Sequence, residues 1–338
     1  MADLNYISGI ESGALGVHRR SSSWRIFACA ALAMPFTLHA QTDFPNKPLR
    51  ILVGFPAAST ADIVARQLAS RMSDTIGQQV LVENRAGAGS SIAAEAVARA
   101  PGDGYTLLLS TIANSINPSL FKVPFDFQKD LAAVALLAET PGLLAAHPSA
   151  PPNVRELIAQ AKTKAGGISY ASAGTGTVTH LYGELFNLAT GVKLAHVPYK
   201  GSGQAQIDLM AGHIKLLFTP AASVIGPIKA GKLIALGSIG RDPLASLPGV
   251  PTLASSGVAG FDAGLWFGLN APGATPPAIV LRLNQEAARV LAMPDVRKQF
   301  ASQELQAIGG SSDAFATFIR QETEKWARVV KAADIKAE

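Results

Sequence analysis

The chain has 338 residues, of which 48% are hydrophobic, with a net charge of +5 and one cysteine. The basic excess is small and spread along the chain, without the basic runs of nucleic-acid binders, so we expect no nucleic-acid partner. A single cysteine excludes a disulfide framework, and the length suits two domains of ordinary size.

Residues 1–40 are typical of a secretory signal peptide. Arg19, Arg20 and Arg25 precede an apolar run over 26–38, and the segment ends at the small residue Ala40. The run is too short for a membrane span, and no later stretch is long and apolar enough for one. We therefore expect export to the periplasm without stable membrane insertion; a buried N-terminal helix is the alternative. Cleavage after Ala40 removes Cys29, two acidic and three basic residues, which lowers the net charge to +4.

The next part of the chain alternates predicted strands and helices. Strands are predicted over 49–53, 80–83 and 106–110, and helices over 60–76, where Gly77 ends the helix, and 90–98. In the helix over 60–76, Val64, Leu68 and Met72 recur every four residues and form one apolar face. Strand–helix–strand alternation predicts a parallel sheet with helices on both faces.

A second α/β unit is predicted from about Pro141. Asn153 caps a helix through residue 164, and strands over 168–171, 214–218 and 233–238 alternate with a helix over 180–189. The tail returns to helices. Thr275 is predicted as a cap with Pro276 in the first turn, and the last helix covers 312–333.

Motifs for cofactor chemistry are incomplete. Residues 87–89 and 174–176 each begin a dinucleotide fingerprint, but Ile92 and Thr179 stand where its third glycine belongs. Residues 226–233 read GPIKAGKL, and Leu233 replaces the Ser or Thr of a phosphate-binding P-loop, so a turn between a helix and a strand is favoured. We expect no cofactor.

Metal and catalytic sites are also poorly supported. His180 and Glu184 share a helix face at a four-residue spacing, which offers two metal ligands, but a capping or surface role is favoured and we expect no metal. The nucleophile-elbow pattern GxSxG is absent, and paired carboxylates cannot be placed from the sequence alone. The sequence thus gives no reason to propose an enzyme.

Two loops share one design. Each follows a predicted strand, contains small and hydroxyl residues, and opens a helix. A helix start carries unpaired N–H groups and the positive end of the helix dipole, and together these attract an anion without Lys or Arg. The alternative is two ordinary capped turns. The candidate ligand-binding residues are Phe55, Ala57, Ala58, Ser59 and Thr60 in the first loop, and Ser172, Gly174, Thr175, Gly176 and Thr177 in the second.

Four further side chains are candidates for the same site. Asp62 can bind an ammonium group of the ligand or, at the third position of its helix, stabilise the helix start. Tyr199 and Lys200 are candidates for contacts to the distal end of the ligand. Trp266 can wall the cleft or belong to an aromatic core.

Short segments throughout the chain carry a resemblance to a known family. They are FPNKPLR at 44–50, GFPA at 54–57 with Asp62 and Arg66, VENRAGAG at 82–89, PGDGYTL at 101–107, Asn117-Pro118, Tyr170-Ala171-Ser172, Gly176-Thr177 with His180-Leu181, HVPYKG at 196–201, LPGVPT at 247–252, Trp266-Phe267-Gly268 and Lys325-Trp326. Together these segments resemble the Bug, or tripartite tricarboxylate transporter receptor, family.

The resemblance implies a two-lobed α/β periplasmic-binding-protein fold, type II-like, that closes on its ligand like a Venus flytrap. Lobe 1 would comprise 41–141 and 259–338, and lobe 2 would comprise 142–258. The implied ligand is a small carboxylate, such as a di- or tricarboxylate, an acidic amino acid or an aromatic acid, with one carboxylate held by backbone groups of the two loops. The family often has paired glycines where this chain has Ala58 and Ser59, and a Cβ there removes freedom for positive φ.

The resemblance also implies partners. A monomeric receptor would deliver its ligand to a membrane transporter of the tripartite tricarboxylate type or to a sensor. Two alternatives stay open at this point: a periplasmic enzyme that acts on a small carboxylate, and a sensory or scaffold protein that keeps the fold but has lost the ligand.

Overall fold

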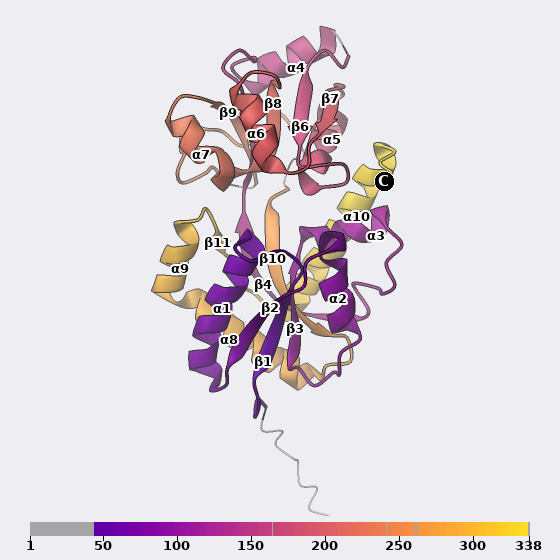
Figure 1. Cartoon of the computed structure of the whole chain (residues 1–338), viewed down its shortest axis with the longest axis vertical. Helices are drawn as coiled ribbons and strands as arrows, with labels where there is room; N and C mark the ends of the chain where they lie inside the picture. The colour runs from indigo at the N-terminus through magenta and orange to yellow at the C-terminus, as the bar shows by residue number, and fades with distance from the viewer. Residues whose placement is uncertain (1–43, 164, 241, 260, 262, 337–338) are drawn as a thin grey trace, which may run out of the picture. The chain divides into compact units, whose positions relative to one another are not determined.

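The computed structural model describes residues 44–163, 165–240, 242–259, 261 and 263–336. The predicted signal peptide, with Cys29, lies outside the described residues. Within them, no helix is long and apolar enough to cross a membrane. Two sheets, each covered by helices, make up the described chain (Figure 1).

The first sheet has six strands in the order β11-β4-β10-β3-β1-β2. Their bounds are β1 Leu49–Val53, β2 Val80–Asn84, β3 Thr106–Thr111, β4 Leu131–Thr140, β10 Leu265–Pro272 and β11 Gln306–Ala307. β1 pairs in parallel with β2 and β3, whereas β10 is antiparallel to β3 and β4. The parallel pairing predicted for β1, β2 and β3 is therefore confirmed. The antiparallel strands were not among those predicted, and they arise because β4 leaves toward the second sheet and β10 returns from it.

Helices cover both faces of this sheet, because alternate strand residues point to opposite sides. Ile51 and Val53 belong to one core cluster and Leu52 to another. The first cluster includes α1 (Thr60–Ile76), α8 (Pro277–Ala292) and α9 (Pro294–Ala301); the second includes α2 (Ser91–Ala98), α3 (Ile112–Leu120) and α10 (Ser312–Ala332). A short 3-10 turn, η1 (Ala88–Ser90), precedes α2. We call this sheet and its helices the first lobe.

The second sheet has five strands in the order β7-β6-β8-β5-β9. Their bounds are β5 Gly142–Ala146, β6 Ser169–Ser172, β7 Ala195–Pro198, β8 Leu216–Pro220 and β9 Ile234–Ile239. One face packs against α4 (Val154–Thr163) and α5 (Val178–Thr190), and the other against α6 (Ser202–Met210) and α7 (Ala221–Lys229). We call this sheet and its helices the second lobe.

The chain passes between the lobes twice, through Pro141 between β4 and β5, and through the segment between β9 and β10. The lobes also share a core cluster that contains residues of α3 and α10 from the first and α5 from the second. There the rings of Tyr182 and Trp326 lie with centroids 6.1 Å apart. The contact between α5 and α10 therefore holds the second lobe against the first in this conformation.

Several predicted boundaries need correction. The helix over 60–76 is confirmed, and Gly77 caps it with φ 78°. The helix predicted from residue 180 starts two residues earlier, at Val178, and the strand before it ends at Ser172. Thr275 is not the cap of α8. Pro276 occupies that position with ψ 140°, because Pro277 forces the residue before it out of the helical region.

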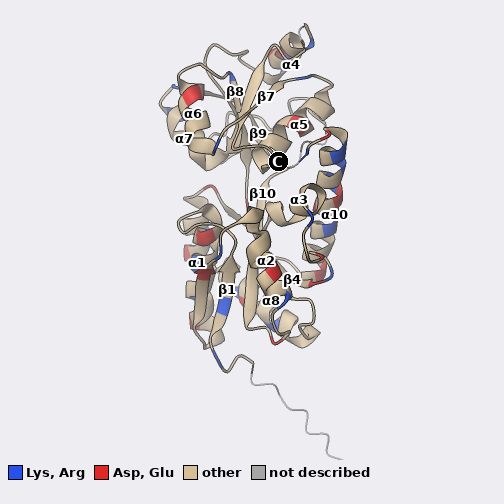
Figure 2. Cartoon of the chain, turned by 45° about the vertical axis from the view of Figure 1, so that its right-hand side comes forward, with Lys and Arg blue, Asp and Glu red and all other residues tan. Residues whose placement is uncertain are grey.

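Charges of both signs are interspersed on the surface. Lys and Arg alternate with Asp and Glu along α10 (Figure 2). Several charged side chains pair with one another, as Arg71 on α1 does with Asp295 on α9 at 2.6 Å, but such half-exposed pairs add little stability. Recognition of an anion must therefore come from local groups rather than from a broad field of one sign.

Candidate functional site

The first loop connects β1 to α1 and is folded onto its own helix start. Ser59 is the N-cap, with extended backbone (φ −68°, ψ 159°), and its Oγ accepts a hydrogen bond from Asp62 N at 3.3 Å. Ala58 before it has φ 64°, a left-handed conformation that favours glycine. The Cβ of Ala58 disfavours positive φ, but it does not prevent the turn. The alanine adopts the left-handed conformation at some cost in strain.

A buried carboxylate holds this loop from behind. Asp62 is 2% exposed, and its oxygens accept hydrogen bonds from Ala58 N (2.9 Å), Arg66 Nε (3.0 Å) and Asn84 Nδ2 (2.8 Å). Asn84 also donates to Phe55 O at 3.1 Å, which ties the loop to the end of β2. Burial raises the pKa of Asp62, but these hydrogen bonds outweigh it and leave the pKa below its usual value. Asp62 thus orders the loop at the start of α1, which is nearer to its predicted role at the helix start than to a contact with the ligand.

Helix geometry leaves two main-chain donors of this loop unused. Because Ser59 Oγ takes the N–H of Asp62, the N–H groups of Thr60 and Ala61 remain without an acceptor inside the helix. Thr60, Ala57 and Ala58 are exposed, and Phe55 is half-buried against the core. The helix start is therefore open to an anion, and its side chains are small.

The second loop connects β6 to α5 and repeats this backbone geometry. Its N-cap, Thr177, has φ −72° and ψ 159°, nearly the angles of Ser59. Gly174 (φ 132°) and Gly176 (φ 75°) occupy conformations that L side chains rarely adopt. Thr177 Oγ1 donates to Gly174 O at 2.7 Å, and no side chain caps the helix. The N–H groups of Val178, Thr179 and His180 therefore lack a helical acceptor.

Two histidines hold the second loop from behind. Gly176 N donates to His180 Nδ1 at 3.1 Å, and Ser172 Oγ lies 2.6 Å from His196 Nε2. The two imidazoles stack with centroids 3.8 Å apart and an interplanar angle of 11°. The stacking of these two rings was not predicted, because the histidines lie on different elements and only the fold brings them together.

The predicted capping role of His180 agrees with its bond to Gly176, but the ring is buried rather than on the surface, at 6% exposed. Its Nε2 lies 3.8 Å from Glu184 Oε1, beyond hydrogen-bond distance. Among the described residues, no group of three or more His, Cys, Asp or Glu side chains is arranged to hold a metal ion.

Tyr199 and Lys200 follow β7 beside the second loop. Tyr199 N donates to Ser172 O at 3.2 Å, and its hydroxyl donates to Asp208 on α6 at 2.8 Å. Burial and the Asp208 carboxylate raise the pKa of Tyr199 to about 12. Lys200 is exposed. Of the two, Lys200 has the side chain free to reach a ligand, whereas the Tyr199 hydroxyl is engaged within its own lobe.

Trp266 belongs to the core. It is 1% exposed, and Phe315 and Phe318 pack edge-on against it, with ring centroids 5.8 and 5.7 Å away. Its Nε1 donates to Glu322 Oε2 at 3.2 Å. The side chain therefore has neither exposed surface nor a spare donor for a ligand, and of its two predicted roles the aromatic core is the one that its surroundings support.

Known proteins are similar to this chain over most of its length. The family model "Tripartite tricarboxylate transporter family receptor", TctC, matches residues 64–335. The chain belongs to this family. Protein BugT of Bordetella pertussis is 35% identical over 316 residues, which cover 91% of this chain and 95% of that protein.

Solved structures agree with the family assignment. A periplasmic transporter protein is 37% identical with a TM-score of 0.74, and the alignment covers 87% of this chain and 99% of that one. Rpa4515 of R. palustris, solved with adipate, is 31% identical with the same TM-score and coverage. The fold is thus the two-lobed α/β fold of periplasmic binding proteins, as predicted, and the chain is a solute-binding receptor of the TctC family rather than an enzyme.

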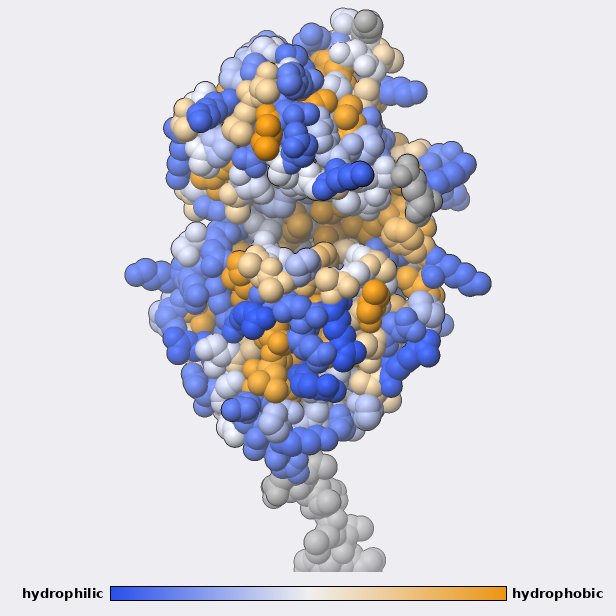
Figure 3. Space-filling model, viewed as in Figure 1, coloured by the Kyte–Doolittle hydropathy of each residue, from blue (hydrophilic) through white to orange (hydrophobic). Residues whose placement is uncertain are grey.

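The second loop of this TctC-family receptor lies against the first lobe. A Cβ placed on Gly176 would come within 3.1 Å of Leu120 Cδ1, at the end of α3. On the face shown in Figure 3, the surface is hollowed between the lobes and hydrophobic residues line the hollow.

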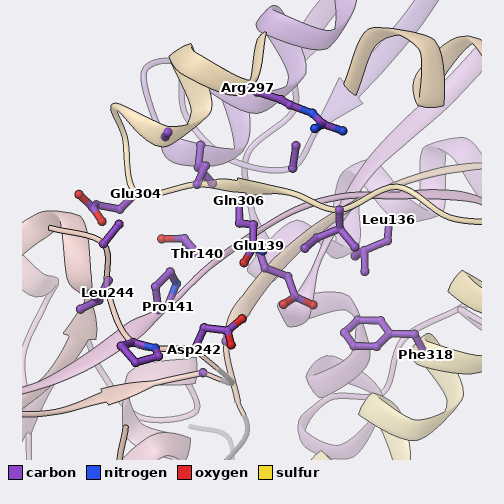
Figure 4. Close-up of a pocket in the computed structure, with 18 residues that line it drawn as sticks. Leu136, Glu139, Thr140, Pro141, Asp242, Leu244, Arg297, Glu304, Gln306 and Phe318 are labelled. Atoms are coloured by element: carbon purple, nitrogen blue, oxygen red, sulfur yellow. The ribbon is translucent and has the colours of Figure 1, made fainter. Parts of the chain in front are cut away.

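A separate cavity of about 730 Å³ lies where the crossover segments pass between the lobes. Glu139, Asp242 and Glu304 bring carboxylates to it, and Arg297 reaches it from α9 (Figure 4). None of the predicted site residues lines this cavity. Its three carboxylates would repel an anion, so this lining does not suit an anion-binding site.

Proposed function

We propose that this receptor binds a small carboxylate between the first and second loops and delivers it to a tripartite tricarboxylate transporter or to a sensor. The observation that supports the proposal is that both lobes contain a helix start of the same geometry after a strand. In each, a strand ends in a loop whose N-cap has ψ 159°, and the first N–H groups of the following helix have no acceptor in the helix.

The physical argument rests on charge at helix starts. The unpaired N–H groups and the helix dipole favour a negative group at this position. A carboxylate has two oxygens and accepts about four hydrogen bonds, which the two free donors of the first loop and two of the three at the second helix start can supply. A ligand that contacts both lobes binds the closed state more tightly than the open one, and only this difference in affinity can shift the equilibrium toward closure.

Similarity supports the ligand class. The relative Rpa4515, 31% identical, was solved with the dicarboxylate adipate. By analogy we propose a di- or tricarboxylate, an acidic amino acid or an aromatic acid as the ligand, with Lys200 near its distal end. We also propose export through the N-terminal segment 1–40 and a monomeric receptor.

Proline at the first helical position provides a direct test, because it removes one N–H while its ring fits the first turn of a helix. Thr60→Pro and Val178→Pro each delete a proposed donor. Ser312→Pro in α10 is the matched control, since Ser311, Ser59 and Thr177 have nearly the same N-cap angles. Affinity for adipate, citrate, glutamate and benzoate is measured by calorimetry.

We expect Thr60→Pro and Val178→Pro to weaken binding of the best ligand by about tenfold or more, because a hydrogen bond to a charged group contributes about 1.5–3 kcal/mol. Ser312→Pro should lower stability through loss of its bond to Val134 O and leave affinity unchanged. Equal affinity in all four proteins, or no binding of any carboxylate together with no retained ligand in native mass spectrometry, would overturn the proposal.

A further inference from the structure

Three aromatic rings form a stack beneath the second loop. Tyr170 on β6 lies 5.1 Å from His196 on β7, centroid to centroid, and His196 lies 3.8 Å from His180 on α5. The parallel pairing of β6 with β7 places Tyr170 directly opposite His196. Tyr170 is anchored at its other end, where its hydroxyl donates to Glu184 at 2.7 Å. Three different elements therefore fix the orientation of both imidazoles.

Each imidazole holds the loop through a ring nitrogen. His180 Nδ1 accepts from Gly176 N, in the middle of the loop. His196 Nε2 bonds to Ser172 Oγ, which in turn accepts from Gly174 N at 3.1 Å. Gly174 and Gly176 have positive φ, so the loop has little intrinsic preference for this shape and depends on such bonds. The imidazoles are thus connected to the loop that carries the proposed donors.

The bond from Gly176 requires His180 to be unprotonated at Nδ1, because a protonated nitrogen cannot accept. Burial favours this state. Burial lowers the pKa of His180, although the Glu184 carboxylate acts to raise it. Burial and the neighbouring His180 lower the pKa of His196 to about 4. Tyr170, the third titratable group in the stack, stays neutral because burial and Glu184 raise its pKa. The stack is therefore neutral near pH 7.

We propose that His180 and His196 are positioning residues for the carboxylate site: their neutral rings hold the second loop in its binding conformation, and protonation of His180 releases it. The proposal rests on the proposed function, since it assumes that the second loop binds the ligand. It adds a regulation that follows from the bond between Gly176 and His180. A receptor built in this way binds its ligand near neutral pH and releases it as the solution becomes acidic.

Two substitutions at His180 distinguish its role as a hydrogen-bond acceptor for Gly176 N from its ability to take up a proton. His180→Asn keeps an oxygen near the position of Nδ1 but does not titrate, whereas His180→Leu fills similar space without an acceptor. Affinity for the best carboxylate is measured from pH 8 to pH 5 for both variants and the wild type. Dividing the wild-type affinity by that of His180→Asn at each pH cancels the ionisation of the ligand itself.

We expect His180→Leu to bind about tenfold more weakly than wild type at pH 7.5, and His180→Asn to bind within about threefold, because only the first leaves the Gly176 N–H unpaired. The ratio of wild type to His180→Asn should fall as the pH decreases below about 6.5. An affinity of His180→Leu equal to wild type, or a ratio that stays constant or rises on acidification, would overturn the proposal.

Hydrogen exchange of the loop amides provides a readout that needs no ligand. The Gly176 amide should exchange faster in His180→Leu than in wild type and stay protected in His180→Asn. Unchanged protection in His180→Leu would overturn the positioning role even if carboxylates bind. Conversely, the expected exchange pattern without carboxylate binding would leave the positioning role standing and reject only the proposed function.

Discussion

Replacement of Ala58 by glycine should stabilise the protein. Ala58 has φ 64°, and an L residue with a side chain loses about 1–2 kcal/mol in this conformation. Glycine removes this strain but makes the unfolded chain more flexible, which costs about 0.4–1 kcal/mol. The Ala58 side chain is exposed, so its removal leaves no cavity. We expect a net gain of about 0.5–1 kcal/mol, or a melting temperature higher by about 1–4 °C.

Ala57→Gly is the matched control, because Ala57 is also exposed but is not among the residues with positive φ. It should lower the free energy of unfolding by up to about 1 kcal/mol. Urea unfolding followed by circular dichroism gives both values, and an unchanged dependence on urea would show that the unfolded states are comparable. Destabilisation by Ala58→Gly, or equal effects of the two changes, would refute the argument from strain.

Three further predictions concern the second loop, the core tryptophan and pH. Gly176→Ala and Gly191→Ala should both lower the free energy of unfolding by about 0.5–1 kcal/mol, because strain at φ 75° and 67° costs about 1–2 kcal/mol and a less flexible unfolded chain offsets about 0.4–1 kcal/mol. Only Gly176→Ala should weaken carboxylate binding in calorimetry, because Leu120 faces that position alone. Trp266→Phe should lower the free energy of unfolding, measured in urea, by about 1–3 kcal/mol and leave carboxylate affinity within about twofold. A larger loss of affinity would instead support its predicted role in the wall of the cleft. Because folding lowers the pKa of His180 and His196 below 6.5, the melting temperature should fall as the pH decreases from about 6.5 toward 4, and His196→Gln should flatten this dependence.

The fold was predictable where local signals agree. In α1, Val64, Leu68 and Met72 recur at helical spacing between the cap Ser59 and the terminator Gly77, so both ends were correct. Helix α3 was missed, because Pro118 and its two asparagines are unfavourable inside a helix. The crossover strands β4 and β10 were also missed, since they are buried on both faces and their runs lack the alternation that marks a strand.

The site was predictable only in part for a related reason. Loop residues beside a helix start leave a local signature, which is why Ser59 and Thr177, the N-caps of α1 and α5, were among the candidates. The side chains that hold the loops leave none. Asn84 lies on β2 and reaches Asp62 on α1, and His196 lies sixteen residues beyond His180 on a different element. Strand β7 was not among the predicted strands, so the in-register pairing that sets Tyr170 beside His196 was not available from the sequence.

The two loops share a backbone shape, but an ionised carboxylate holds the first and a neutral imidazole holds the second. These groups take up protons at different pH, which determines which loop loses its support first on acidification. Asp62 holds the first loop as a carboxylate, and its hydrogen bonds keep the pKa below 3.8, so this support persists until the pH falls through that lower value. His180 holds the second loop as a neutral base, and its support weakens once the pH drops below about 6.5. At pH 5, hydrogen exchange should therefore accelerate at Gly176 while Ala58 stays protected. Ligand would then be released from the second lobe first, with the first loop still formed.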